Sequence, residues 1–423
     1  MLGGIIEFLV VFCYLFCFSL KGGHGIDSSM VVAGYLIIYG LLNPSYRASV
    51  FVFLLSSFPR KIYTFYIIIN IWILLVISIN DTYDYSYVLT FLHMLFLIIV
   101  GMLVYLYFVF RGKVDRIVWL MVASFALQSL IEWCAFLIPS FKEIINFTKS
   151  EETIAKGLGY AGVRANGLAG SDFFGLSAAF AVMCIVFLSK KNTWFSNNRA
   201  FKFLLFVFLL SGTFFAGRTG YVGLMVVALF SVLNKREFFS KRKTNNKEKV
   251  VWLIIIGSFF TIISTIVFLY NTNEDIQNLL NFTFQNIFTL LEEGSMKTSS
   301  MESLDNMYFV IDPMTFFLGA GQYVGKHGGY YMSTDVGYMR VILYMGVIGL
   351  ILLLFMQYTI MQLRKGSEIK LKKYLFLLLL ILNAKGEVIV WNQIVLDTVV
   401  LFCLQDTLNN KQCTKKKLFV YDC

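Results

Sequence analysis

Charged residues are scarce in this sequence. Asp, Glu, Lys and Arg make up 14% of the 423 residues, whereas hydrophobic residues make up 58%. A soluble globular protein has roughly a quarter of its residues charged, so this balance excludes a soluble domain of useful size. Runs of about 20 apolar residues, the length that an α-helix needs to cross a bilayer, recur along the chain. We therefore expect a single integral membrane domain over 1–423, an all-α polytopic bundle of transmembrane helices.

Motifs for binding nucleotides or metals are also missing. The sequence has no Walker loop, no Rossmann fingerprint, no H-E-x-x-H and no cluster of Cys and His. The net charge is +11, but Lys and Arg occur in short clusters between apolar runs, not along a face that would fit nucleic acid. We expect no cofactor, no metal and no nucleic-acid partner. Any reaction must then draw its energy from the substrate.

Twelve apolar stretches are predicted to be transmembrane helices. They are 4–20, 26–42, 62–79, 87–110, 117–138, 172–189, 201–217, 219–233, 250–270, 336–358, 371–384 and 387–405. A shorter run at 48–58, between Pro44 and Pro59, is expected to be interfacial or re-entrant. The first 20 residues have no basic region before their apolar stretch and no small-residue cleavage site, which predicts a retained helix instead of a signal peptide.

The distribution of Lys and Arg predicts the orientation, because cytoplasmic loops carry an excess of both. Basic clusters lie at 111–116, 190–202, 235–249, 364–373 and 415–417. With these in the cytoplasm, both termini are inside, and the alternate loops face outward. Two of the outward loops are long, 139–171 and 271–335. We expect chemistry on the outer face to lie in these two loops.

The first candidate stretch closes the first long loop. Residues 162–172 are rich in Gly, carry the single cation Arg164, and lead into a predicted helix. Glycine lets the backbone approach a ligand closely, and a helix N-terminus favours an anion. Arg164 would add bidentate contacts to a phosphate. The alternative is a Gly-rich turn capped by Ser171 or Asp172, with Arg164 at the level of the lipid headgroups.

The second candidate stretch is the tight connection at 212–220, which places Arg218 at the outer boundary of the bilayer. A charge at that depth needs a partner or a water-filled cavity, so Arg218 is a functional candidate. The alternative is a side chain that reaches up to a lipid phosphate.

The third candidate stretch closes the second long loop. Lys326, His327, Asp335 and Arg340 lie within one short segment that also contains several Gly and Tyr residues. They could supply an anion site and a general base, and the tyrosine rings could stack on sugar faces. The alternatives are an exposed His without a role and an Asp335 that only caps the following helix.

In their order along the chain, these stretches resemble the O-antigen polymerase family (Wzy type), related to the O-antigen ligases among the GT-C membrane glycosyltransferases. Family members carry an Arg, ten residues and then Gly in both long loops. Arg164 and Gly175 have this spacing, and Lys326 and Gly337 have it with Lys in place of Arg. Further similarity lies in the Gly-Arg-Thr-Gly turn at 217–220, the Gly-x-Gly at 319–321, the run Thr-Asp-Val-Gly-Tyr-Met-Arg at 334–340 and the segment 346–349.

The resemblance implies an enzyme of the Gram-negative inner membrane that is active on the periplasmic side in lipopolysaccharide biosynthesis. It would transfer a growing glycan from undecaprenyl diphosphate to the non-reducing end of a new lipid-linked repeat unit, with anomeric inversion and without a metal. Arg164, Arg218, Lys326 and Arg340 would hold the diphosphate. Asp335 or His327 would be the base, and Asp335 is favoured because a helix start fixes its position. Whether a chain-length regulator also binds is open.

Three other functions fit parts of the sequence. An O-antigen ligase, or a polymerase of another surface polysaccharide, uses the same donor and similar loops. The second long loop of a ligase also carries a functional His, so His327 is compatible with a ligase. A flippase or transporter of lipid-linked sugars should have charges spread through many helices and no enlarged outer loops, whereas the charges here gather at loop ends. A scaffold protein would tolerate replacement of Arg164, Arg218 or Arg340.

Overall fold

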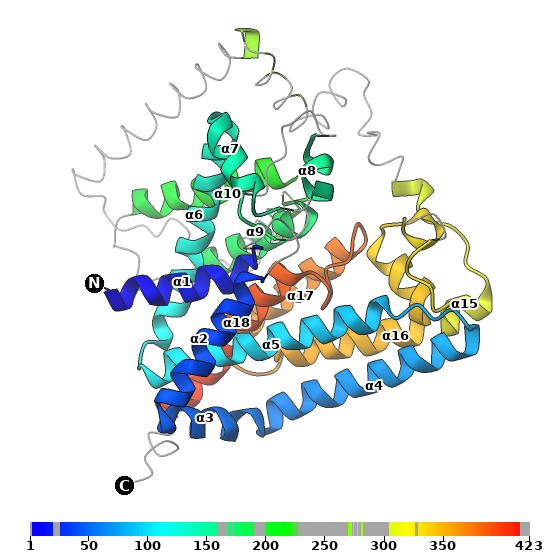
Figure 1. The fold of residues 1–423 in the computed structure, drawn as a ribbon, viewed down its shortest axis with the longest axis horizontal. Helices are drawn as coiled ribbons and strands as arrows, with labels where there is room; N and C mark the ends of the chain where they lie inside the picture. The colour runs from blue at the N-terminus through cyan, green and yellow to red at the C-terminus, as the bar shows by residue number, and fades with distance from the viewer. Residues whose placement is uncertain are drawn as a thin grey trace. The chain divides into compact units, whose positions relative to one another are not determined.

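The computed structural model describes residues 2–19, 26–149, 151–158, 167–170, 173–189, 199–217, 304–325 and 329–414, and several residues between 219 and 281. Among them the secondary structure is helical, apart from two isolated β-bridges. The chain forms two compact units (Figure 1). Unit 1 comprises 1–124, 169–171 and 304–423, and unit 2 comprises 125–168 and 172–303.

Unit 1 holds most of the described helices. They are α1 (Leu2–Phe16), α2 (Ser28–Leu42), α3 (Pro44–Leu54), α4 (Ser57–Asn80), α5 (Ser86–Phe110), η1 (Val114–Arg116), α15 (Pro313–Leu318), η2 (Tyr331–Ser333), α16 (Gly337–Met361), α17 (Ile369–Asn383) and α18 (Gln393–Thr414). α6 (Ile117–Leu137) begins in unit 1 and continues in unit 2, which also holds α7 (Pro139–Asn146), α8 (Glu151–Leu158), α9 (Phe173–Ser189) and α10 (Arg199–Ala216).

The apolar helices fit a membrane-embedded protein. Four helices in the described part of the chain are long and apolar enough to cross a bilayer: Ser57–Asn80, Ser86–Phe110, Val114–Leu137 and Gly337–Met361. The pair α2 and α3 would make a fifth span, although it is bent by 118°. This bend agrees with the prediction that the run at 48–58 is interfacial or re-entrant. The count of twelve spans stays a prediction, because 250–270 and most of 219–233 lie outside the described residues.

One predicted boundary is wrong. The stretch 387–405 was expected to be helical throughout, but α18 begins only at Gln393, and 384–392 form a non-helical connection after α17. Apolar residues alone do not show where a helix begins when no capping residue precedes them. The error matters, because Glu387 lies in this connection.

Proline marks helix starts in this chain. Pro44, Pro139 and Pro313 lie at the first positions of α3, α7 and α15, where the missing backbone N–H has no intrahelical partner to lose. At α15 the Asp312 carboxylate also accepts a hydrogen bond from the Thr315 backbone N–H at 2.9 Å. These residues end one helix and begin the next at a fixed place.

Helices α4, α5 and α16 run side by side in unit 1 (Figure 1), with α4 in contact with both of the others. α5 is buried along most of its length and also packs on α1, α2, α3 and α18. Gly101 of α5 lets Tyr14 of α1 approach, since a Cβ there would lie 2.2 Å from the Tyr14 hydroxyl. The core of unit 1 is thus built around α5.

A break in α16 links it to the segment before it. Met345 and Gly346 are not helical, and Gly346 has a φ of 68°. The carbonyl groups released by the break accept hydrogen bonds from outside the helix: Leu343 from the Ala320 N–H at 2.7 Å, Tyr344 from the Gly321 N–H at 3.0 Å, and Met345 from the Trp72 indole at 2.8 Å. The segment 319–321 is therefore attached to the first third of α16.

One buried carboxylate of unit 1 is paired with three cations. Glu7 in α1, which is 1% exposed, meets three cations of the 111–116 turn: Arg111 at 3.3 Å, Lys113 at 2.6 Å and Arg116 at 3.6 Å. Because that turn is predicted to face the cytoplasm, the contact places the start of α1 at the same side. A buried carboxylate without such partners would be costly.

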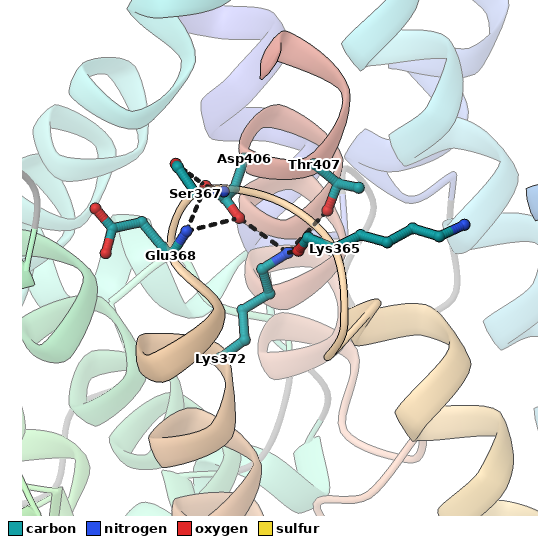
Figure 2. A network of polar contacts seen from close by, with 6 residues as sticks. All are labelled: Lys365, Ser367, Glu368, Lys372, Asp406 and Thr407. Carbon is teal, nitrogen blue, oxygen red and sulfur yellow. Dashed lines mark hydrogen bonds and ion pairs between the residues drawn. The ribbon is translucent and has the colours of Figure 1, made fainter. Parts of the chain in front are cut away.

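A second buried pair joins α17 to α18 (Figure 2). The Lys372 Nζ lies 2.9 Å from the Asp406 carboxylate, and neither side chain is exposed. Lys372 also donates to the Lys365 carbonyl at 2.5 Å and to the Thr407 hydroxyl at 2.8 Å. Asp406 accepts hydrogen bonds from the Ser367 hydroxyl at 2.6 Å and the Glu368 backbone N–H at 3.1 Å. This network fixes the connection between α16 and α17 against α18.

The pairing predicts an asymmetry between single and double substitutions. Lys372→Met should destabilise the protein by about 3–5 kcal/mol, because it leaves Asp406 as a buried, uncompensated charge. Lys372→Met combined with Asp406→Leu should cost less than either substitution alone. Thermal unfolding in detergent micelles measures this, with Lys373→Met at an exposed neighbour as the control. A double variant less stable than both singles would contradict the assignment.

Candidate functional site

The candidate site is centred on Arg340 in the first turn of α16. Its side chain is 9% exposed, and its Nη1 lies 3.0 Å from the Glu387 Oε2. Glu387 comes from the 384–392 connection, at the end of α17 that is predicted to face outward. A guanidinium this well buried needs a partner, because removal of a charge from water costs several kcal/mol. Arg340 was predicted as a site residue, and the structure supplies its counter-ion.

Two tyrosine rings enclose the Arg340 guanidinium. Its central carbon lies 4.3 Å from the ring centre of Tyr323 and 3.7 Å from that of Tyr330, both within cation–π distance. The two tyrosines meet because the chain folds back on itself between them. The Gly325 N–H donates to the Gly329 carbonyl at 2.7 Å, and the Tyr331 N–H donates to the Tyr323 carbonyl at 2.9 Å. The Gly-rich stretch thus forms a hairpin that brings two rings to one cation.

A stack of further aromatic rings supports this pair. The Tyr87 ring lies 3.9 Å from Trp391, 4.2 Å from Tyr344 and 4.8 Å from Tyr323, centre to centre. These residues come from α5, the 384–392 connection, α16 and the 319–325 segment, so the rings join four parts of unit 1. Aromatic rings of this kind also offer apolar faces on which sugars stack.

Glu387 is held by three side chains. Its Oε1 accepts a hydrogen bond from the Tyr87 hydroxyl, and its Oε2 accepts one from the Tyr323 hydroxyl at 3.1 Å besides the ion pair with Arg340. Burial raises the pKa of the Glu387 carboxyl to about 7, while Arg340 and the Tyr87 hydroxyl act in the opposite direction. The carboxyl therefore changes its charge near neutral pH.

The short loop at 80–86, which is predicted to face outward, positions the 319–325 segment. The Asp84 carboxylate accepts hydrogen bonds from the backbone N–H groups of Tyr323 at 2.7 Å and Val324 at 3.1 Å. The Tyr344 hydroxyl donates to the Asp84 carbonyl at 2.6 Å, and the Thr82 hydroxyl donates to the Gly321 carbonyl at 2.7 Å. Asp84 thus sets the place of Tyr323, although it does not touch Arg340 itself.

Asp335, the favoured base, lies in the connection between η2 and α16. It is exposed, and it is not the N-cap of α16, since the helix begins at Gly337 with Val336 in that position. The helix start was expected to fix the Asp335 side chain. Because Asp335 lies before the helix, it does not. Partial desolvation by neighbouring atoms raises the pKa of the Asp335 carboxyl, and Lys385 opposes this.

The other predicted site residues lie outside the described residues: Arg164, Arg218, Lys326 and His327. The surroundings of one of them are described. In unit 2 the Ser177 hydroxyl donates to the Gly217 carbonyl at 2.6 Å and accepts from the Gly220 N–H at 2.7 Å. The turn that carries position 218 is therefore attached to α9.

Sequence reasoning missed Glu387, Tyr87 and Trp391 as site residues, whereas Tyr323 lies in the third candidate stretch, whose tyrosine rings were predicted to stack on sugars. Glu387 was included in a predicted transmembrane helix, and nothing in its neighbourhood marks it as a partner of Arg340. The one available signal is the polar run Lys385-Gly386-Glu387 between two apolar stretches. Such a run predicts a connection between helices, where a buried acid would be a functional candidate.

The arrangement is suited to binding an anion beside an apolar, aromatic surface. Within the described residues, Arg340 Nε and Nη2 have no hydrogen-bond partner, and both are buried. In the same part of the chain, no group of three or more His, Cys, Asp and Glu side chains is placed to hold a metal ion. Comparisons with protein-family models, with curated proteins and with solved structures find no match for this chain.

The contacts of Asp84 predict a local loss of order when it is replaced. Asp84→Ala removes the two hydrogen bonds that its carboxylate accepts from the 319–325 segment, each worth about 1.5–3 kcal/mol, and should raise amide hydrogen exchange across 319–325 by tenfold or more. Mass spectrometry of the purified protein measures this exchange. Asp81→Asn, in the same loop, is the control, because Asn tolerates the left-handed backbone of this position, where φ is 50°. Equal exchange in both variants would show that Asp84 does not position the segment.

Proposed function

We propose that this protein is an O-antigen polymerase of the bacterial inner membrane, with its active site facing the periplasm. It transfers a growing glycan from undecaprenyl diphosphate to the non-reducing end of a new undecaprenyl-diphosphate-linked repeat unit. The observation that carries the proposal is the Arg340 guanidinium, enclosed by Tyr323 and Tyr330 at the predicted outer end of α16. A cation in an aromatic surface suits a substrate that joins a diphosphate to sugars.

To use such a donor, the protein mainly has to stabilise the leaving diphosphate. As the bond between the sugar C1 and the diphosphate oxygen breaks, negative charge develops on the leaving group, and a preorganised guanidinium stabilises it. Arg340 has this role, with Arg164, Arg218 and Lys326 as further diphosphate contacts. The energy comes from the diphosphate linkage, which agrees with the missing nucleotide motifs.

The acceptor hydroxyl attacks the C1 atom from the face opposite the diphosphate, so the anomeric configuration inverts. Its proton passes to a general base, for which Asp335 and His327 are the candidates. Asp335 is exposed at the start of α16, five positions before Arg340. This location lets it reach a hydroxyl on a bound sugar without first breaking a buried contact.

An O-antigen ligase is the second candidate, because it uses the same lipid-linked donor. His327 in the second outer loop favours it. The two functions differ in what happens when the gene is lost: loss of a polymerase leaves a single repeat unit on the lipopolysaccharide core, and loss of a ligase leaves the core bare.

Lipopolysaccharide from a strain that lacks the gene tests the proposal. Complementation with the wild type should restore a ladder on a gel, and the deletion alone should show core plus one repeat unit. Arg340→Ala should lower polymerisation by about 10²–10³-fold, and Arg340→Lys should restore part of it, because Lys keeps the charge but not the planar geometry.

Arg364→Ala, an exposed Arg in the turn after the same helix, is the matched control at equal protein level. It should retain a full ladder. A bare core in the deletion strain would instead indicate a ligase or a flippase. A full ladder with Arg340→Ala would remove Arg340 from the site.

A further inference from the structure

Glu387 neutralises the Arg340 guanidinium through a contact with one of its nitrogens. The Arg340 Nη1 lies 3.0 Å from the Glu387 Oε2, and the guanidinium carbon lies 4.3 Å from the Tyr323 ring centre and 3.7 Å from the Tyr330 ring centre. The remaining nitrogens, Nε and Nη2, have no hydrogen-bond partner among the described residues. While the ion pair stands, the charge of Arg340 is cancelled, and a phosphate gains little from it.

We propose that Glu387 is an exchangeable placeholder for the phosphate of the substrate: a bound diphosphate replaces the Glu387 carboxylate on Arg340, and Glu387 takes up one proton from solvent as it is displaced. This inference rests on the proposed function, in which Arg340 binds a lipid-linked diphosphate. It adds a positioning residue that acts through Arg340.

The proton is required by the balance of charge. A displaced carboxylate would be buried without its cation and next to a second anion, and both conditions favour its neutral form. With the proton bound, the site changes from an Arg340–carboxylate pair to an Arg340–phosphate pair beside a neutral acid. The Tyr87 and Tyr323 hydroxyls are placed to keep hydrogen bonds with that acid.

The groups around Glu387 place this exchange near neutral pH. Among the described residues, the charged or titratable side chains that contact it are Arg340 from α16, Tyr87 from α5 and Tyr323 from the 319–325 segment. Asp84 binds the backbone of Tyr323 and not Glu387. Burial raises the pKa of the Glu387 carboxyl to about 7, so the proton is available at pH 6 and has to be acquired at pH 8.

The direction of the pH dependence follows from this linkage. Below about pH 7 the acid is already neutral, and a diphosphate meets a free guanidinium. Above that pH, the ionised carboxylate competes with the ligand, and the affinity falls by up to about tenfold per pH unit. Glu387→Gln keeps the shape of the side chain and its capacity for hydrogen bonds, but it cannot ionise.

Calorimetric titration of the full chain in detergent micelles tests the proposal, with farnesyl diphosphate as the probe. Between pH 6 and pH 9, wild type and Glu387→Gln are compared in two buffers of different ionisation enthalpy. Ionisation of the probe is the same for both proteins and cancels. We expect similar affinities at pH 6, a wild type about tenfold weaker than Glu387→Gln at pH 8, and about one more proton taken up by the wild type.

A second variant guards against misfolding of the first. Tyr87→Phe removes a hydroxyl that favours the ionised carboxylate, so the pH at which the affinity of the wild type falls should move upward. Parallel pH profiles for wild type and Glu387→Gln would overturn the proposal. So would weaker binding by Glu387→Gln at every pH, which a purely structural partner predicts, or no binding of the probe by either protein.

The outcome is separable from that of the proposed function. If the probe binds with proton uptake while the deletion strain shows no defect in polymerisation, the polymerase assignment fails and the exchange on Arg340 stands. If the deletion strain lacks a ladder while the pH profiles are parallel, the polymerase assignment stands and the placeholder role fails.

Discussion

The central constraint on unit 1 is that a buried guanidinium must have a counter-ion. Arg340 meets it with Glu387, which requires the chain to remain non-helical over 384–392 so that the acid reaches the start of α16. Tyr87 and Tyr323 then bind the acid, and the rings around them follow from those hydroxyl contacts. The aromatic cluster is therefore joined to the ion pair through these two hydroxyl groups.

The break in α16 is the second feature that positions the residues of the site. A continuous helix would use the carbonyl groups of residues 343–345 within itself, and nothing would then attach the 319–321 segment. The break makes those groups available to another part of the chain, and Asp84 adds a second attachment three residues later, at Tyr323 and Val324. Both Tyr323 and Arg340 are positioned by this shared set of hydrogen bonds, although 17 residues separate them in the sequence.

Much of this arrangement could be predicted from the sequence, because apolar runs and prolines are local signals. Most described apolar stretches form helices near their predicted bounds, apart from 387–405, and Arg340 was identified from its place beside a Gly-rich segment. Glu387 and Asp84 could not be predicted in the same way. Their roles depend on contacts with residues 47 and 239 positions away, and a single sequence carries no signal for such a pairing. Asp335 was misplaced for a smaller reason, since the helix begins at Gly337, one residue later than predicted, and Val336 is its N-cap.

Gly346 has a consequence for how α16 is held in unit 1. Its φ of 68° and the Phe317 carbonyl oxygen, 2.1 Å from where a Cβ would lie, leave no room for another residue there. The first third of α16 is hydrogen-bonded to 319–321, whereas the rest of the helix continues toward α17 and the Lys372–Asp406 pair. The break therefore divides α16 into two segments with different attachments, so that the position of Arg340 depends on the 319–321 segment as well as on the helix itself.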